Sequence, residues 1–508
     1  MRNWVRGGAT LIGVWIADDF SLALGRWGVA SAARVVHGHV IFAALCLLSN
    51  RDMALMAEFL LMSSVLASAH GRLGYFWHIT DLHWDIHYGT ESHNCWHGGG
   101  GGGRDGGQQQ FGDHNCDSPW SLIQSAVRMM RDKHGDNIEF VLWTGISYYF
   151  NSLSRKSGRL PSHSLNALKN LTTLLRNTFS SQFVFPVMGH DDPIYPYRHL
   201  TTLWKQWLPN EALYTLSKGG YYTIEQKVRK LRLVLLNTNL WAASQNNDED
   251  PENQWLWLED VLQKSQRNKE TVYLVGHVAP GADERQAMPT RKSILPRHNA
   301  KYLDLVRRYA NIITGQFFGH LHSDSFRVIY SDDGKPVSWI FLAPSVTPRR
   351  TQSGSNNPAL RLYKFDTDTG QVQDYVQYYL DLSTANRDHR AEWQIEYNLT
   401  SYYGFRQVSA RDLHELAESF TVPDGHLLFS RYYLANSVQT SGLGLHDVNA
   451  AWAHSHYCAI SRVDYTQYQS CLATGARALA ASTSLGSRTT HSNKLLLIIL
   501  GYLASVTR

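Results

Sequence analysis

The sequence predicts an α/β fold built of separate strand and helix layers, followed by a mainly helical C-terminal region. Two observations predict the layers. Short apolar runs alternate with longer segments of helical periodicity, and four of five such runs lead directly into Asp or His. A third observation predicts the C-terminal region, because charged and aromatic-rich segments replace this alternation after about Thr384.

Five short apolar runs predict the strands that carry these polar residues. They cover residues 75–80, 139–145, 182–189, 271–277 and 312–319. The first leads into Asp81-Leu82-His83 and the last into His320-Leu321-His322, whereas Ile146 follows the second, where an Asp is expected. Residues at the carboxyl ends of strands line one edge of a sheet, which is the usual place for a ligand site in α/β proteins.

The segments between and after these strands predict the other elements. Helical spacing of apolar residues follows Asp117-Ser118-Pro119 and recurs in residues 165–179, 255–262 and 300–309. Strand-like stretches cover residues 337–342, 359–365 and 372–380. Beyond them, Trp393, Tyr397 and the segments 413–420 and 427–434 predict helices that pack on the core.

Length and composition exclude several classes of protein. With 508 residues and 43% hydrophobic residues, the chain can bury a large core. Its net charge of +5 comes from 48 basic and 43 acidic residues without a Lys or Arg block, which argues against a nucleic-acid polymer as partner. No CxxC motif is present, so a thiolate zinc site is not expected.

The cysteines and two sequons predict an oxidising, extracellular setting. Apart from Cys46 in the leader, the cysteines form two local pairs that suit short-loop disulfides, Cys95 with Cys116 and Cys458 with Cys471. Asn170 and Asn398 each begin an Asn-Leu-Thr triplet and are candidate glycosylation sites. Secretion would explain both the paired cysteines and the two triplets. The alternative for the triplets is that they occur by chance.

Both ends of the chain have the pattern of processing signals. Residues 1–69 predict a leader, with an apolar h-region at 54–66 and cleavage after Ala69; a longer signal-anchor is the alternative. Residues 476–508 predict a GPI-attachment signal, because small residues and a polar spacer precede an apolar tail that begins at Leu495. A terminal amphipathic or buried helix is the alternative there.

The Asp and His residues at the strand ends have the spacing of metal ligands. Asp81 and His83 are two positions apart, as are His320 and His322, so each pair points to one side of an extended chain. His277 ends its strand alone. Zinc accepts these ligand types, and two neighbouring ions can activate water and neutralise a phosphoryl group. A hydrogen-bonded structural role is the alternative for any single histidine among them.

The motifs around these residues resemble the calcineurin-like metallophosphoesterases and, more closely, the acid sphingomyelinase-like phosphodiesterases. The resemblance extends from about His70 to Cys471 and rests on residues 76–83 (FWHITDLH), 111–113 (FGD), 116–120 (CDSPW), 141–145 (VLWTG), 276–281 (GHVAPG) and 319–322 (GHLH). It implies a four-layer α/β/β/α sandwich, two zinc ions and phosphodiester hydrolysis. The family's ligands fall on Asp81, His83 and His322 for the first ion and on His277 and His320 for the second.

Two positions depart from the family pattern. The family's Gly-Asp motif supplies a carboxylate that bridges both ions, but here Ile146 follows Gly145 and cannot ligate. The family's Gly-Asn-His-Asp motif supplies an Asn ligand and a His that protonates the leaving group, whereas this chain reads Gly189-His190-Asp191-Asp192. Aligned without a gap, His190 replaces the Asn ligand. With a one-residue deletion, His190 and Asp191 keep their identity, and His190 is the candidate proton donor.

These features lead to two functional hypotheses. The first is a secreted or GPI-anchored zinc phosphodiesterase that hydrolyses phosphodiester or pyrophosphate bonds of lipids or nucleotides, with a degenerate site that retains two, one or no ions. The second is a catalytically silent relative that binds a phosphate-bearing lipid or a protein partner at the cell surface. In both, residues 70–383 form the metallophosphoesterase domain and residues 384–475 a C-terminal acid sphingomyelinase-like domain.

Overall fold

The computed structural model describes most of the chain from Arg72 onward. The described residues are 72–89, 109–145, 162–190, 192, 197–226, 230–242, 248–284, 294–350, 354–422, 426–440 and 450–475. The predicted leader and C-terminal signal lie outside them, as do Cys95, Ile146 and Asp191. Among the described helices, none is both long enough and apolar enough to cross a membrane.

One six-stranded sheet contains the first three predicted strands. Its order is β14 (Trp393–Asn398), β13 (Val372–Leu380), β12 (Ala359–Asp366), β1 (Leu73–Thr80), β2 (Phe140–Thr144) and β3 (Phe183–Val187). β1, β2 and β3 are parallel, so their carboxyl ends lie at the same edge. On the other side of β1 the pairing is antiparallel throughout: β12 pairs with β1, β13 with β12, and β14 with β13.

The second six-stranded sheet contains the other two predicted strands, those at residues 271–277 and 312–319. Its order is β4 (Tyr222–Gln226), β5 (Leu231–Leu235), β6 (Thr271–Val275), β7 (Ile313–Phe318), β9 (Pro336–Leu342) and β8 (Ser325–Tyr330). β5, β6, β7 and β9 are parallel, and the edge strands β4 and β8 are antiparallel to their neighbours. A short hairpin, β10 (Arg349–Arg350) with β11 (Gly354–Ser355), follows the sheet.

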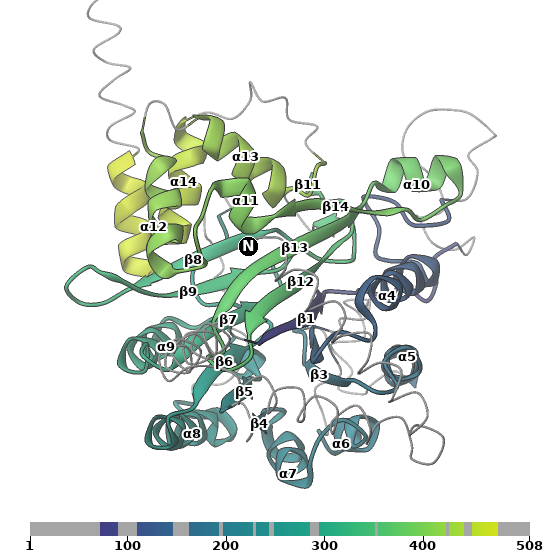
Figure 1. The fold of residues 1–508 in the computed structure, drawn as a ribbon, viewed down its shortest axis with the longest axis horizontal. Coiled ribbons are helices and arrows are strands. Elements are labelled where there is room, and N and C mark those ends of the chain that lie inside the picture. Colours follow the sequence, from purple (N-terminus) through teal and green to yellow (C-terminus); the bar gives the residue numbers. More distant parts are fainter. Residues whose placement is uncertain are drawn as a thin grey trace, which may run out of the picture. The chain divides into compact units, whose positions relative to one another are not determined.

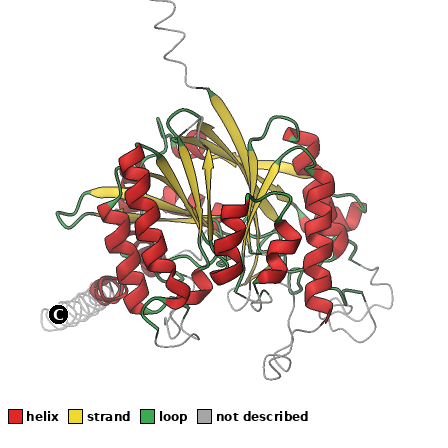
Figure 2. Cartoon of the chain, turned by 90° about the horizontal axis from the view of Figure 1, so that it is seen from below, coloured by secondary structure: helices red, strands yellow, loops and turns green. Residues whose placement is uncertain are grey.

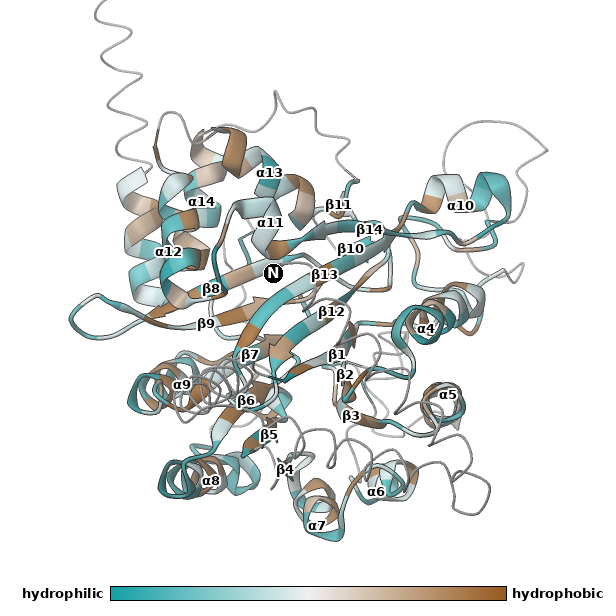
Figure 3. Cartoon of the chain, viewed as in Figure 1, coloured by the Kyte–Doolittle hydropathy of each residue, from teal (hydrophilic) through white to brown (hydrophobic). Residues whose placement is uncertain are grey.

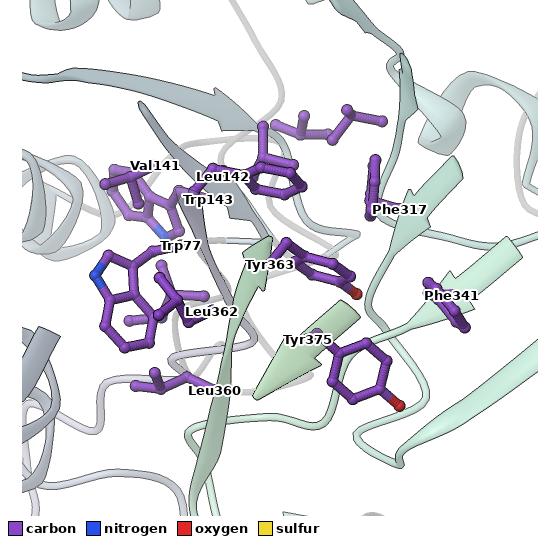
Figure 4. Packing of buried hydrophobic residues seen from close by; sticks show 14 of the residues in the cluster. Trp77, Val141, Leu142, Trp143, Phe317, Phe341, Leu360, Leu362, Tyr363 and Tyr375 are labelled. Atoms are coloured by element: carbon purple, nitrogen blue, oxygen red, sulfur yellow. The ribbon is translucent and has the colours of Figure 1, made fainter. Parts of the chain in front are cut away.

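The two sheets pack face to face through aromatic side chains. The Phe76 ring stacks on Phe140 and Tyr363 of its own sheet, at centroid distances of 4.8 and 4.9 Å, and meets Phe317 of the other sheet edge-on at 5.3 Å. Trp77, the next residue, points to the opposite face, as the close view of the core shows (Figure 4). This alternation follows from the two-residue period of a strand.

Helices cover the outer face of each sheet. α4 (Trp120–His134) and α5 (Ser162–Thr178) belong to the first sheet, and α8 (Gln254–Asn268) and α9 (Pro296–Arg308) to the second. Helices therefore lie on both sides of the strands (Figures 1 and 2). β5 and β6 are mostly hydrophobic, whereas α8 and α9 carry hydrophilic residues as well, because only one side of each helix is buried (Figure 3). The four-layer α/β/β/α arrangement is confirmed. The connection between β3 and β4 adds α6 (Arg198–Trp204) and α7 (Asn210–Gly219).

The C-terminal region joins both sheets. Its helices are α10 (Leu382–Asp388), α11 (Leu399–Tyr403), α12 (Ala410–Ser419), α13 (His426–Asn436) and α14 (Ala450–Ser461). α12 packs on β9 and α14 on β8. The prediction of a helix at Trp393 and Tyr397 is wrong, because these residues belong to β14. Residues four positions apart share a face in a strand as well as in a helix, so their spacing could not separate the two.

The predicted modification sites lie on different kinds of surface. A disulfide joins Cys458 to Cys471, and Cys116 is also disulfide-bonded, although its expected partner Cys95 lies outside the described residues. Asn170 is exposed on α5, whereas Asn398 is half-buried at the end of β14. Glycosylation of either residue stays a prediction.

Candidate metal centre

The candidate ligands converge where strands of both sheets end. They are Asp81 and His83 after β1, His190 after β3, His277 after β6, and His320 and His322 after β7. Main-chain hydrogen bonds tie these ends together: Asp81 N–H donates to Gly145 O at 3.2 Å, and Gly319 N–H donates to His277 O at 3.1 Å. The sheets thus bring together every residue that the strand-end pattern had selected.

Asp81, His83 and His322 form the first cluster. Their ligand atoms all lie within 4.8 Å of one another. The Nε2 atoms of His83 and His322 are 3.5 and 3.4 Å from Asp81 Oδ1. All three residues are buried. One carboxylate and two imidazoles can hold a zinc ion and leave a coordination position open.

His190, His277 and His320 form the second cluster, whose ligand atoms also lie within 4.8 Å of one another. His190 Nδ1 is 3.0 Å from His277 Nε2 and 3.3 Å from His320 Nδ1. His277 is fully buried, whereas the other two remain partly accessible. This cluster has no carboxylate of its own, and its three imidazoles are a ligand type that zinc accepts.

Asp81 lies between the two clusters. Its Oδ2 accepts hydrogen bonds from the Thr80 hydroxyl at 2.7 Å and from the main-chain N–H of His320 at 2.8 Å. Within the described part of the chain, its Oδ1 accepts no hydrogen bond, although it is buried and lies 3.4 to 3.9 Å from Nε2 of His83, His277 and His322. A buried carboxylate oxygen without a donor is costly, and a cation at this point would remove that cost. The side chains present therefore fit a metal ion.

Main-chain carbonyls fix the orientation of two of the histidine rings. His322 Nδ1 is 2.7 Å from Arg349 O, and His277 Nδ1 is a longer 3.4 Å from Thr144 O. Because a carbonyl can only accept, each Nδ1 carries the proton and each Nε2 is left with a lone pair toward Asp81. Such outer hydrogen bonds are how metal-binding histidines are oriented in proteins.

The backbone around the ligands is strained and tightly packed. Asp81, His83, His320 and His322 have φ values of 49°, 39°, 70° and 58°, in the left-handed region that costs most residues free energy. At Gly145, where φ is 105°, a Cβ atom would lie 2.5 Å from His277 Nδ1. A Cβ at Gly319 would lie 2.7 Å from Asp81 Oδ2. Glycine at these two positions allows the strand ends to approach the ligands.

The environment keeps the ligands in their metal-binding protonation states. Burial lowers the pKa of His277 to about 4 and also holds the pKa values of His320 and His322 below the ordinary value. Burial alone would raise the pKa of Asp81, but the adjacent His277 and His322 hold it well below its usual range. At neutral pH His277, His320 and His322 therefore offer nitrogen lone pairs and Asp81 offers a carboxylate, which are the forms that coordinate metal.

Three residues at the site were missed by the sequence analysis. Thr80 donates to Asp81, and Asp117 Oδ1 lies 3.9 Å from His83 Nδ1, with its Oδ2 3.7 Å from Arg349 Nη1. Thr80 and Asp117 stand inside the motifs FWHITDLH and CDSPW, so their position was a usable signal. Arg349 contacts His322 through its main-chain carbonyl, which any residue type could provide.

The sequence is similar to characterised families over most of its length. Residues 335–478 match the family model of the acid sphingomyelin phosphodiesterase C-terminal region. The chain is 36% identical over 428 residues to the human acid sphingomyelinase-like phosphodiesterase 3b, covering 80% of this chain and 91% of the relative. It is 36% identical over 425 residues to the bovine cyclic GMP-AMP phosphodiesterase SMPDL3A, covering 78% and 90%.

A more distant relative also matches most of the chain. The sphingomyelinase phosphodiesterase C of Dictyostelium discoideum is 30% identical over 395 residues, which cover 73% of this chain and 87% of the relative. These matches cover between 73% and 80% of this chain. The chain belongs to the acid sphingomyelinase-like phosphodiesterases.

Proposed function

We propose that this protein is a secreted, metal-dependent phosphodiesterase that acts on phosphodiester or pyrophosphate bonds of lipids or nucleotides. Relatives named for sphingomyelin and for cyclic GMP-AMP support the bond type, because both compounds contain phosphodiesters. Zinc is the proposed ion, since the ligand set consists of imidazoles and one carboxylate. Secretion and attachment to the cell surface through a GPI anchor are part of the proposal and rest on the sequence signals alone.

One observation carries this proposal: Asp81 Oδ1 is reached by histidines of both clusters. It lies 3.4 Å from His322 Nε2 in the first cluster and 3.9 Å from His277 Nε2 in the second. A carboxylate shared in this way can take over the role of the bridging aspartate that the family has where this chain has Ile146. Asp81, His83 and His322 would hold the first ion, and Asp81 with the second cluster would hold the other.

His190 is proposed as a ligand of the second ion rather than as the proton donor. Its Nδ1 lies between His277 Nε2 and His320 Nδ1, which is where a third ligand belongs. This assignment agrees with the alignment in which His190 replaces the family's asparagine. When bound, the ions would supply positive charge that activates water and neutralises the phosphoryl oxygens. The chain's own contribution is to orient His277 and His322 through main-chain carbonyls and to keep His277, His320 and His322 unprotonated by burial.

The alternative is a catalytically silent relative that binds a phosphate-bearing lipid or a protein. The observation that favours it is Ile146, because the chain provides one carboxylate where the family provides two. Two divalent ions with a single negative charge between them repel each other more strongly, so the second ion should bind more weakly. In this case the site would hold one ion and present it to an anionic ligand.

Hydrolysis of a generic phosphodiester separates the two functions. The purified protein should release p-nitrophenol from bis(p-nitrophenyl) phosphate, lose this activity in a chelator and regain it with zinc. The matched variant is Ile146→Asp, which restores the family's second carboxylate. Turnover by Ile146→Asp together with none by the natural sequence would refute the enzymatic proposal and support the silent relative.

A further inference from the structure

The turn that carries two of the candidate ligands is held in place by the C-terminal region. His320 and His322 lie on the turn between β7 and β8, both with positive φ, and Asp324 and Ser325 follow one residue later. A strained turn of this kind keeps its conformation only where the surrounding structure enforces it. Two of the side chains that contact the end of the turn come from strand β14 and helix α13, more than 70 residues further along the chain.

Asp324 is the point where these contacts meet. Its Oδ2 accepts a hydrogen bond from the Tyr397 hydroxyl of β14, and its Oδ1 forms an ion pair with Arg361 Nη2 of β12. The main-chain carbonyl of Asp324 accepts a hydrogen bond from Asn436 Nδ2 of α13 at 2.8 Å. Asp324, Arg361 and Asn436 are at most 5% exposed, so water cannot replace these contacts easily.

Further hydrogen bonds connect the same turn to side chains that are distant in sequence. The hydroxyl of Tyr432, also on α13, is 2.8 Å from Ser325 Oγ, and Asn356 Nδ2 donates to the carbonyl of His322 itself. The Tyr375 hydroxyl is 2.6 Å from that of Tyr397 and fixes its position. Side chains distant in sequence thus secure the turn at His322, at Asp324 and at Ser325.

We propose that Tyr397 and Asn436 are positioning residues that hold the His320–His322 turn in its ligand geometry before metal binds. The proposal rests on the metal-binding function proposed above, and it assigns the C-terminal region a role in metal affinity. Neither side chain contacts a ligand atom, so both act through Asp324. Loss of either contact should allow the turn to leave its strained conformation. Metal binding would then have to order the turn, and the free-energy cost of this ordering would lower the metal affinity.

The test uses the full chain with Tyr397→Phe and Asn436→Ala, and with Tyr465→Phe as the matched control. Tyr465 is a buried tyrosine of the same region whose hydroxyl donates to Ile294 O at 3.0 Å, away from the turn. The first measurement is hydrogen exchange of the metal-free protein. The amides of His320 and Leu321, which donate to Asp81 Oδ2 and Gly319 O, should exchange at least about 10-fold faster in the two test variants and at the natural rate in the control.

The second measurement is zinc affinity by competition with a chelator. The test variants should bind zinc about 10-fold more weakly than the control, in line with the usual effect of removing an outer contact of a metal site. Equal exchange and equal affinity in all three variants would overturn the proposal. If the natural protein binds no zinc, the metal-binding function fails, and the exchange rates still decide whether Tyr397 and Asn436 hold the turn. If Asn436→Ala does not fold, Tyr397→Phe, which removes a single oxygen atom, decides the question.

Discussion

Two buried groups of polar side chains lie next to each other in this protein and differ in how their charges are satisfied. One is the metal centre around Asp81. The other is the Asp324 network, in which Asp324 contacts Arg361 and Tyr397, Arg361 donates to Gln377, and Gln377 donates to the partly exposed Glu396. In the network, Asp324 has an ion pair at Oδ1 and a hydrogen bond at Oδ2. In the metal centre, Asp81 Oδ1 accepts no hydrogen bond from the described residues.

The difference separates a structural role from a ligand-binding role. A buried carboxylate with partners on both oxygens is complete within the protein, and removal of a partner should mainly reduce stability. A buried carboxylate that has one oxygen without a hydrogen-bond donor, among neutral imidazoles, instead gains its missing partner when the protein binds a metal ion. Mutations in the network should therefore change the free energy of unfolding and affect metal binding only through the His320–His322 turn, whereas mutations at Asp81 should remove a metal ligand itself.

The largest effect on stability is expected for Arg361→Met. This change leaves the Asp324 carboxylate buried without its cation, which typically costs about 3–5 kcal/mol. Urea unfolding of the metal-free protein measures it. The double variant Asp324→Asn/Arg361→Met is the control and should recover most of the loss, because it removes both charges. A loss below about 1 kcal/mol for the single variant would contradict the structural role of the pair.

A smaller, pH-dependent effect is expected at Glu396. Burial raises the pKa of this side chain from 4.5 to about 8, so the folded protein keeps a proton that the unfolded chain releases. The stability contributed by this proton is complete below about pH 4.5 and is lost as the pH rises through about 8. For this partly exposed carboxyl, the loss should be on the order of 2 kcal/mol after solvent screening.

Unfolding measurements between pH 5 and 8 on Glu396→Gln check this expectation, since glutamine cannot titrate. The variant should lose less stability than the natural protein over that interval. Glu392→Gln, at an exposed position just before β14, is the matched control and should follow the natural protein. Parallel pH profiles for all three proteins would show that Glu396 is not protonated in the fold.

The smallest effect on stability is expected for Gly145→Ala, which tests the metal centre without changing its charge. The left-handed backbone should cost about 1–2 kcal/mol, and the new methyl group would press on His277. Gly404→Ala is the matched control, because Gly404 also has positive φ but a methyl group there would meet no packed neighbour within 4 Å among the described residues. Gly404→Ala should lose stability through its backbone conformation alone, Gly145→Ala should lose somewhat more because of the contact with His277, and only Gly145→Ala should bind zinc more weakly in a titration. Equal zinc affinity would mean that Gly145 is not needed for the position of His277.

Most of the layered fold could be predicted because local sequence determines it. The five strand-end segments are apolar runs bounded by polar residues, and the period of their side chains is visible without tertiary information. β4, β5 and β8 were not predicted, although β5 is buried throughout. β14 was predicted as a helix because the spacing of Trp393 and Tyr397 fits both structures.

The site could be predicted in part for the same reason. Asp81, His83, His277, His320 and His322 stand at strand ends, and parallel strands bring such ends together. The role of His190 could not be decided from the sequence, because two alignments were equally possible; its distance from His277 and His320 favours a ligand. The Asp324 network could not be predicted either, since the partners of Asp324 come from β12, β13 and β14 and meet the β7–β8 turn only in the folded chain.

Zinc content of the purified protein is the most direct test of the central claim, that Asp81 is shared by both clusters. The natural protein should carry up to two zinc ions per chain, and Asp81→Asn should carry none while it remains folded by circular dichroism. The companion variant His190→Ala should lose only the second ion, because the first cluster does not include it. Zinc content in Asp81→Asn equal to that of the natural protein would contradict the account.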